Sequence, residues 1–181
     1  VRRHLLPLFP GTGASDLFVA NCGMNAVDAA FRAIAEQQAA QGRTVWVQLG
    51  WLYLDTIALL QKFTATPADY VHVADVFDLA ALDAVLARHA GRVAGILTEV
   101  PTNPLIQTPD VAGIAALARR HGARVILDPS ISSAFSVDVL RHADVVVSSL
   151  TKYTGSAGDL TAGLAVVNPA APGAAELRAG I

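Results

Sequence analysis

The chain has 181 residues, of which 53% are hydrophobic and 15% are charged, a composition that excludes disorder and fits one domain with a substantial core. Its net charge of −2 argues against nucleic-acid binding, and no apolar run is long enough to span a membrane. The single Cys22 excludes an internal disulfide and indicates a reducing compartment, so we expect a cytoplasmic protein. The five histidines are scattered without metal-ligand spacing, so no metal site is expected.

Residues 1–20 are predicted to be irregular, with Gly11-Thr12-Gly13 as a plain turn. A long helix is predicted from about residue 21 to Gly42, because apolar residues recur at helical spacing. Further helices are expected at 53–63, at 79–89 behind an Asp78 cap, and from Pro109 behind a Thr108 cap. Short apolar runs predict strands at 44–47, 70–73, 93–100, 124–127, 144–147 and 164–167.

Strands that alternate with helices of this length predict an α/β fold, a mostly parallel sheet sandwiched by helices. Ligands of such sheets bind beyond the carboxyl ends of the strands. Polar residues follow several predicted strands, namely Glu99 with Asn103, Asp128, and the stretch from Ser149 to Lys152. The predicted helix N-terminus at Gly23 either is simply capped or binds an anion at the same crevice.

Lysine is rare here, since only Lys62 and Lys152 occur among 13 basic residues. Lys62 fits the polar face of a predicted helix, whereas Lys152 follows a buried strand. A buried amine is costly, and one chemistry that uses a desolvated lysine is Schiff-base formation with an aldehyde cofactor. Ser149 and Thr151 would then be placed to hold a phosphate. The alternative from this string alone is an exposed loop lysine.

Several motifs together resemble the fold-type-I pyridoxal-phosphate enzymes of cysteine and methionine metabolism. The stretch 149–153, Ser-Leu-Thr-Lys-Tyr, is similar to their cofactor-lysine motif, and 99–104 to their Glu-x-Pro-x-Asn-Pro motif. Val125 to Asp128 resembles their strand that ends in the pyridinium-binding aspartate. Cys22-Gly23-Met24 is similar to their Ser-Gly-Met phosphate turn, and residues 53–56 occupy the place of their Tyr-Gly-Gly-Thr. The resemblance covers about residues 15–170.

The chain departs from these patterns at a few positions. Leu54 and Asp55 replace the two glycines after Tyr53, Pro129 follows the aspartate, and Ser156-Ala157 stands where Gly-His is usual. The Tyr-x-Asp-Thr form, with residues 60–63 after it, most resembles the fungal-type cystathionine γ-synthase branch. The resemblance implies the large cofactor-binding domain of fold-type-I pyridoxal-phosphate transferases.

The resemblance also implies pyridoxal 5'-phosphate as cofactor and assigns roles to individual residues. Lys152 would attach the cofactor and move the Cα proton, and Tyr53 would stack on the ring and assist proton transfer, unless it is a core residue. Asp128 would pair with the protonated ring nitrogen, and Asn103 would bond the phenolic oxygen. The phosphate would be held by Gly23, Met24, Ser149 and Thr151.

The reaction implied is trans-sulfuration, the γ-replacement of an O-acyl-homoserine by cysteine to give cystathionine. The alternatives are a cystathionine or methionine γ- or β-lyase and an O-acylhomoserine sulfhydrylase. We expect an amino-acid substrate and a homo-oligomer, a dimer or tetramer, in the full-length protein. Residues 1–181 are expected to be one large domain, an excised part that lacks the N-terminal segment and the C-terminal small domain of the family. We expect this part to be inactive, or nearly so, by itself.

Two rival hypotheses remain. A nicotinamide-binding Rossmann domain would need Gly-x-Gly-x-x-Gly directly after the first strand, but Asp16 follows Gly11 and Gly13 at the third glycine position and no convincing strand precedes them. A degenerate, non-catalytic domain of the same fold is compatible with the changes at Leu54 and Asp55. The joint presence of Lys152, Asp128 and Asn103 argues against it.

Overall fold

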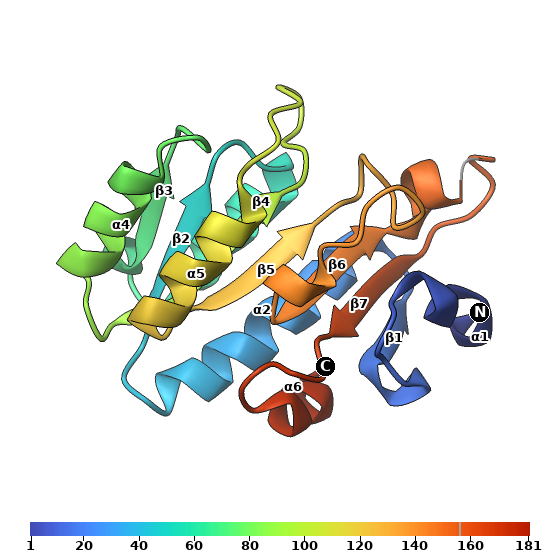
Figure 1. The fold of residues 1–181 in the computed structure, drawn as a ribbon, viewed down its shortest axis with the longest axis horizontal. Helices are drawn as coiled ribbons and strands as arrows, with labels where there is room; N and C mark the ends of the chain where they lie inside the picture. The colour runs from blue at the N-terminus through green and yellow to red at the C-terminus, as the bar shows by residue number, and fades with distance from the viewer. Residues whose placement is uncertain (156) are drawn as a thin grey trace.

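A computed structural model describes residues 1–155 and 157–181, so the predicted departure at Ser156 lies outside the described residues. Its centre is one seven-stranded sheet in the order β1-β7-β6-β5-β4-β2-β3 (Figure 1). Of the described strands, β7 runs antiparallel to both of its neighbours and the other pairs are parallel. The strands are β1 Leu17–Ala20, β2 Val45–Leu49, β3 Tyr70–Val73, β4 Val93–Glu99, β5 Arg124–Asp128, β6 Val145–Ser149 and β7 Gly163–Val167.

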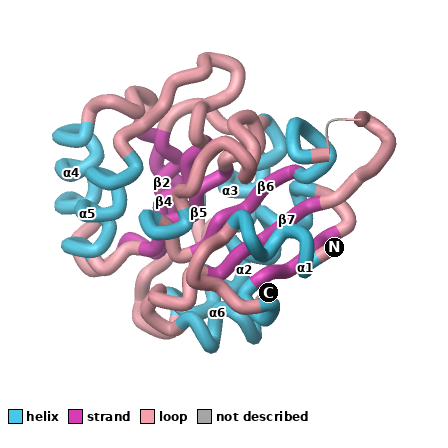
Figure 2. Tube along the Cα trace, turned by 45° about the vertical axis from the view of Figure 1, so that its right-hand side comes forward, coloured by secondary structure: helices cyan, strands magenta, loops and turns pink. Residues whose placement is uncertain are grey.

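Helices cover both faces of this sheet, so the predicted α/β architecture is confirmed (Figure 2). Residues of α1, α4 and α5 pack into the core on one face, and residues of α2, α3 and α6 pack into the core on the other. None of the helices in the described part of the chain is long and apolar enough to cross a membrane. The helices are α1 Arg2–Leu5, α2 Gly23–Ala39, α3 Leu54–Phe63, α4 Leu79–Arg88, α5 Val111–His121 and α6 Ala174–Gly180.

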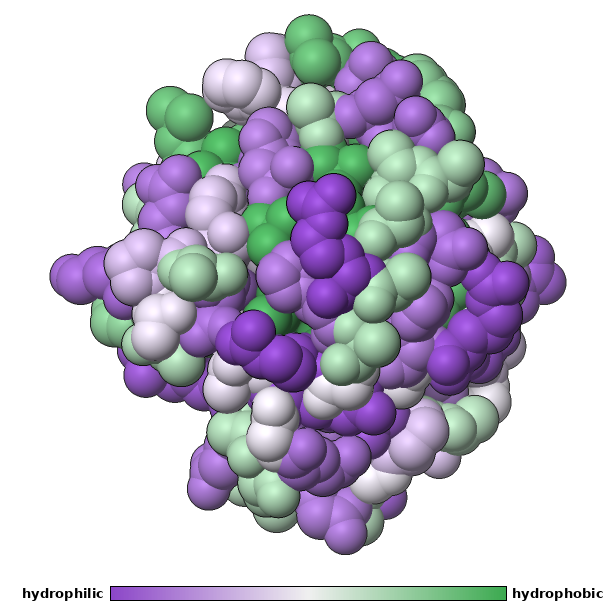
Figure 3. Space-filling model, turned by 90° about the vertical axis from the view of Figure 1, so that its left-hand side faces the viewer, coloured by the Kyte–Doolittle hydropathy of each residue, from purple (hydrophilic) through white to green (hydrophobic). Residues whose placement is uncertain are grey.

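The central strands explain why the sequence showed continuous apolar runs. Every residue of β2, β4 and β7 is buried, because helices lie on both sides of them. Trp46 of β2 packs against Phe31 of α2 with ring centroids 4.7 Å apart. At the sheet edge, β3 has four residues and exposes His72, and Figure 3 shows hydrophilic side chains around smaller hydrophobic areas on that side.

The capping signals were partly right. The Asp78 carboxylate accepts the Ala81 N–H at 2.8 Å, and Gly122 ends α5 in the left-handed conformation with φ 68°, both as predicted. The Thr108 cap is wrong, because α5 begins at Val111 and the Asp110 carboxylate accepts the Gly113 N–H at 2.9 Å. Pro109 therefore precedes the cap instead of opening the helix.

The expectation of an irregular segment over residues 1–20 is also wrong. Arg2–Leu5 form α1, and Leu17–Ala20 form β1, which pairs with β7 in the register Leu17 to Val166. Only Leu17 of β1 is buried, so the strand has no alternating pattern long enough to recognise. Its pairing depends on a strand from the far end of the chain.

Candidate active site

A cavity of about 440 Å³ opens at the carboxyl ends of the parallel strands. Its walls come from the start of α2, the loops after β2, β4 and β5, and the turn after β6. This is the edge where ligands of parallel α/β sheets bind. The structure brings all eight predicted site residues to this cavity: Gly23, Met24, Tyr53, Asn103, Asp128, Ser149, Thr151 and Lys152.

Two acidic side chains lie side by side at the base of the cavity. Glu99 ends β4 and Asp128 ends β5, and the two are cross-strand partners. Burial and the neighbouring Asp128 charge raise the pKa of Glu99 to about 8. Burial raises the pKa of Asp128 to about 6, although Ser130 opposes that shift by hydrogen bonding. The two acids therefore resist carrying two negative charges at once, and a cation in the cavity would favour ionisation of Asp128.

Ser130 fixes the position of Asp128 and was missed from the sequence. Its backbone N–H and its hydroxyl both donate to Asp128 Oδ1, at 2.9 and 2.6 Å. The same hydroxyl accepts the Ser149 N–H at 2.7 Å, so it joins the ends of β5 and β6. A serine two residues after an aspartate is a signal for this local turn, but the link to Ser149 depends on strand order.

Glu99 holds two of the cavity loops and was absent from the predicted site residues. Its carboxylate accepts the backbone N–H of Tyr53 and, at 3.0 Å, that of Asn103. Tyr53 precedes α3 and Asn103 lies in the β4–α5 loop, so one buried side chain sets the spacing of both. The neighbouring proline bonds, Val100-Pro101 and Asn103-Pro104, are cis.

The N-terminus of α2 meets the end of β6 at very close range. A Cβ on Gly23 would lie 2.7 Å from Ser149 Cβ, so only glycine fits there without a shift. No side chain caps α2 at Cys22, and the Gly23 and Met24 N–H groups donate to no acceptor in the described part of the chain. These amides, next to the Ser149 side chain, form an N-terminus that favours an anion.

Lys152 does not match the burial that its strand-end position predicted. It lies at the cavity rim but is exposed, within the irregular turn Leu150–Thr154. The strand before Lys152 is buried, but the turn that carries Lys152 leaves the sheet. The residues of this turn therefore do not bury the amine. The Thr151 hydroxyl donates to the Ala162 carbonyl at 3.2 Å and accepts the Ala162 N–H at 3.0 Å. Its predicted phosphate role stays a prediction.

Tyr53 is a cavity residue and not a core residue. Its side chain is 44% exposed, which contradicts the alternative of core packing. The negative charge of Asp55, two residues further on, raises the pKa of the Tyr53 hydroxyl. Asp55 is one of the positions at which the chain departs from the Tyr-Gly-Gly-Thr pattern.

The rival nicotinamide motif has no structural basis. Gly11 and Gly13 lie before β1 and not between a strand and a helix, and Gly11 adopts φ 86° in a turn. Among the residues described, no group of three or more histidine, cysteine, aspartate or glutamate side chains is arranged to hold a metal ion.

The fold and this cavity together define an α/β cofactor-binding domain. The structure superposes on a cystathionine γ-synthase from Xanthomonas oryzae with a TM-score of 0.77, over 98% of this chain and 43% of that one, at 24% identity. The family model for Cys/Met metabolism PLP-dependent enzymes matches residues 11–178. The chain belongs to this family, and its cofactor is pyridoxal phosphate.

Curated relatives are similar over much of the chain. It is 45% identical over all of its length to the L-2-amino-4-chloropent-4-enoate dechlorinase/desaturase of Streptantibioticus cattleyicolor, of which it spans 36%. It is 35% identical to the cystathionine gamma-synthase of Neurospora crassa, over 85% of this chain and 25% of that protein. Identity to the L-methionine gamma-lyase of Pseudomonas putida is 35%, over 74% of this chain and 35% of that protein.

The residues present fit this cofactor. The cavity contains the Asp128 carboxylate, which suits the cofactor's ring nitrogen, and the Lys152 amine, which suits its aldehyde. The uncapped N-terminus of α2 at Gly23 suits its phosphate. Burial raises the pKa of Asp128, and a positive charge placed beside this carboxylate would favour its ionised form.

Proposed function

We propose that the protein uses pyridoxal phosphate to expel a group from the γ-carbon of an α-amino acid. The observation that carries this proposal is the meeting of Lys152, Asp128 and the free amides of α2 in one cavity at the end of the sheet. The amino-acid class is supported by family membership, and the γ-position by the relatives.

The cofactor, when bound, supplies an electron sink that stabilises negative charge at the substrate α-carbon. Lys152 would attach the cofactor through its amine and would move protons at the α- and β-carbons of the substrate. Its position on an exposed turn gives the amine the freedom to reach more than one carbon. Tyr53, which lines the same cavity, would stack on the ring face.

Asp128 and the α2 N-terminus orient the cofactor from its two ends. The Asp128 carboxylate, held by Ser130, would pair with the ring nitrogen, and that positive charge would favour the ionised form of Asp128. The Gly23 and Met24 amides, with the Ser149 hydroxyl, would bind the phosphate. Asn103, whose backbone is fixed by Glu99, would bond the phenolic oxygen.

The preferred reaction is γ-elimination. In the substrate named for the 45% identical relative, chlorine is on carbon 4, which is the γ-carbon of the amino acid. Lys152 would take a proton from the α-carbon and then one from the β-carbon, and the leaving group would depart from the γ-carbon with the electron pair of its bond. One proton would be returned to the carbon skeleton, so the net loss is one proton and the leaving group, and the product is more unsaturated. γ-Replacement of an O-acyl-homoserine by cysteine is the second candidate, favoured by the 35% identity to a cystathionine γ-synthase and by the Tyr-x-Asp-Thr form.

A substrate panel separates the two reactions. The full-length protein, loaded with pyridoxal phosphate, is given L-2-amino-4-chloropent-4-enoate, or O-acetyl- or O-succinyl-homoserine with and without cysteine. Chloride release without a thiol supports elimination, and cystathionine formation supports replacement. Lys152→Ala is the blank for both. If the cofactor is bound and no substrate is turned over, the proposal is overturned in favour of a non-catalytic domain.

A further inference from the structure

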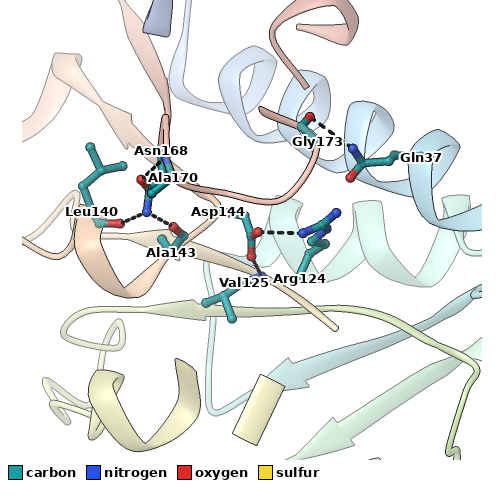
Figure 4. Close-up of polar contacts among 9 residues, drawn as sticks. All are labelled: Gln37, Arg124, Val125, Leu140, Ala143, Asp144, Asn168, Ala170 and Gly173. Atoms are coloured by element: carbon teal, nitrogen blue, oxygen red, sulfur yellow. Dashed lines mark hydrogen bonds and ion pairs between the residues drawn. The ribbon is translucent and has the colours of Figure 1, made fainter. Parts of the chain in front are cut away.

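A second cavity, of about 580 Å³, lies at the amino-terminal end of the parallel strands, opposite the cofactor site. It is bounded by the ends of α2 and α5, the start of β5, the turn Leu140–His142 and the segment after β7 (Figure 4). Among the described residues that line it, Asp144 is the one carboxylate. Four arginines also line it: Arg43, Arg119, Arg124 and Arg141.

One of the four arginines is neutralised. Arg124 Nη1 lies 3.2 Å from Asp144 Oδ1, and the other Asp144 oxygen accepts the Val125 N–H at 2.8 Å (Figure 4). Arg124 is 8% exposed, and its Nε has no hydrogen-bond partner. Each oxygen of the cavity's single carboxylate therefore already has a partner, and Arg124 still has an unpaired donor.

The other three arginines have no acidic partner among the ion pairs of the described residues. Arg43 donates to the His121 carbonyl at 2.8 Å, Arg119 to the Arg141 carbonyl at 3.5 Å, and Arg141 to the His142 ring at 3.0 Å. A guanidinium group has five N–H donors, so most of them stay available. Like charges held together in this way raise the electrostatic potential of the cavity.

His142 is part of the cavity wall. Burial, followed by the charges of Arg141 and Arg119, lowers the pKa of its ring, and the charges of Asp138 and Asp110 oppose that shift. The Arg141 Nε–H donates to His142 Nε2, which requires that nitrogen to be unprotonated. With Nε2 accepting this bond the ring is in its neutral form, and the charged groups of the lining are the four arginines and Asp144.

Gln38 gives an independent sign of a missing ligand. It lines the cavity from α2, its residue is 1% exposed, and its amide oxygen has no hydrogen-bond partner. Its amide nitrogen likewise makes no side-chain hydrogen bond in the described part of the chain. A buried amide oxygen without a donor costs about 1–3 kcal/mol, so a ligand that donated a hydrogen bond to Gln38 Oε1 would be stabilised.

Helix capping explains only part of this arrangement. Both α2 and α5 end here, and cations near a helix C-terminus are favourable. The Arg43 bond to the His121 carbonyl has that role. Capping does not require four arginines from separate segments around one hollow, and it leaves Gln38 unpaired.

We propose that this cavity binds a small molecule that carries a diphosphate group. Guanidinium groups match phosphate oxygens in geometry as well as charge, and three unpaired ones exceed what a single carboxylate can neutralise. The volume lies in the range of small-molecule sites and exceeds that of one phosphate ion. The site is separate from the cofactor cavity and does not depend on the proposed reaction.

The test uses the full-length protein saturated with pyridoxal phosphate, so that the cofactor's own phosphate subsite is filled. Calorimetric titration with sodium pyrophosphate is expected to give one site per chain. Arg119→Gln and Arg141→Gln, both at exposed positions, should each weaken binding about tenfold. Arg88→Gln, an exposed arginine of α4 outside the cavity, is the matched control and should leave binding unchanged.

Adenosine diphosphate, titrated in parallel, shows whether a nucleoside adds affinity to that of the diphosphate alone. Either result supports the site if both arginine variants weaken the binding. Absence of binding at millimolar pyrophosphate overturns the proposal. So does sulfate of equal affinity, which would indicate unspecific charge. An acidic peptide that binds these arginines more tightly than pyrophosphate would assign the surface to a protein segment instead. Unchanged melting temperatures of the ligand-free variants verify their folding.

Discussion

The two ends of β5 have opposite electrostatic character. At its carboxyl end, Asp128 lies beside Glu99, and burial raises the pKa of both acids. At its amino end, Arg124 is paired with Asp144 and surrounded by further arginines. The sheet core between them is apolar, with Val125, Ile126 and Leu127 buried. Charged groups are thus excluded from the strand interior and concentrated where the chain leaves it, which is where ligands bind.

The largest effect is expected at the carboxyl end. Lys152→Ala should abolish the visible absorption of bound cofactor and its borohydride trapping, and reduce turnover roughly a thousandfold, because it removes the attachment point and the proton carrier together. Lys62→Ala, at the other lysine, is the control and should change neither, since Lys62 is exposed on α3. A visible band that persists in the Lys152 variant would contradict the assignment.

The amino end can be tested by breaking its ion pair. Asp144→Asn should destabilise the protein by about 3 kcal/mol, because it leaves the buried Arg124 charge without its partner. Asp28→Asn breaks the exposed pair with Arg32 and should cost within about 0.5 kcal/mol. Urea unfolding of both variants measures the difference. Equal effects would mean that Arg124 is as well solvated as Arg32.

The close contact of α2 with β6 is a test of the anion-binding helix. Gly23→Ala would place a Cβ 2.7 Å from Ser149 Cβ, which should cost about 2 kcal/mol and weaken cofactor affinity by displacing the amides. Asn25→Ala, in the same helical turn but exposed, is the matched control and should be near neutral. Fluorescence titration with pyridoxal phosphate gives the affinity. A Gly23 variant with wild-type affinity would place the phosphate elsewhere.

The acid pair predicts a pH dependence for the cofactor-free protein. The pKa values of Glu99 and Asp128, about 8 and about 6, lie above the ordinary values of 4.5 and 3.8, so the folded state binds more protons than the unfolded state between those limits. The free energy of unfolding should therefore fall as pH rises, by roughly 4 kcal/mol between pH 5 and 7.

Denaturant unfolding at several pH values measures that dependence. Glu99→Gln should flatten the pH dependence, because it removes the carboxyl group whose pKa is raised. Glu36→Gln, at an exposed position of α2, should leave the pH dependence unchanged. Saturation with pyridoxal phosphate should also reduce the slope, since a cation beside Asp128 favours its ionised form. Stability that rises with pH over this range would contradict the burial of the pair.

The sequence by itself determined the pattern of elements and the end of the sheet at which the candidate site lies. Local signals were sufficient for this: Asp78 capped the expected helix, Gly122 ended another, and buried strands appeared as apolar runs. Because parallel strands place their carboxyl ends together, motifs far apart in sequence were expected to meet there, and the cavity contains every residue chosen.

Only the tertiary structure decided the contacts between segments. β1 depends on β7, the Ser130 bridge depends on the order of β5 and β6, and the exposure of Lys152 depends on how its turn leaves the sheet. The arginine-lined cavity is assembled from five separate segments, each of which has an ordinary arginine or polar residue. Such groupings have no local signature, because the free energy that fixes them comes from packing between distant parts of the chain.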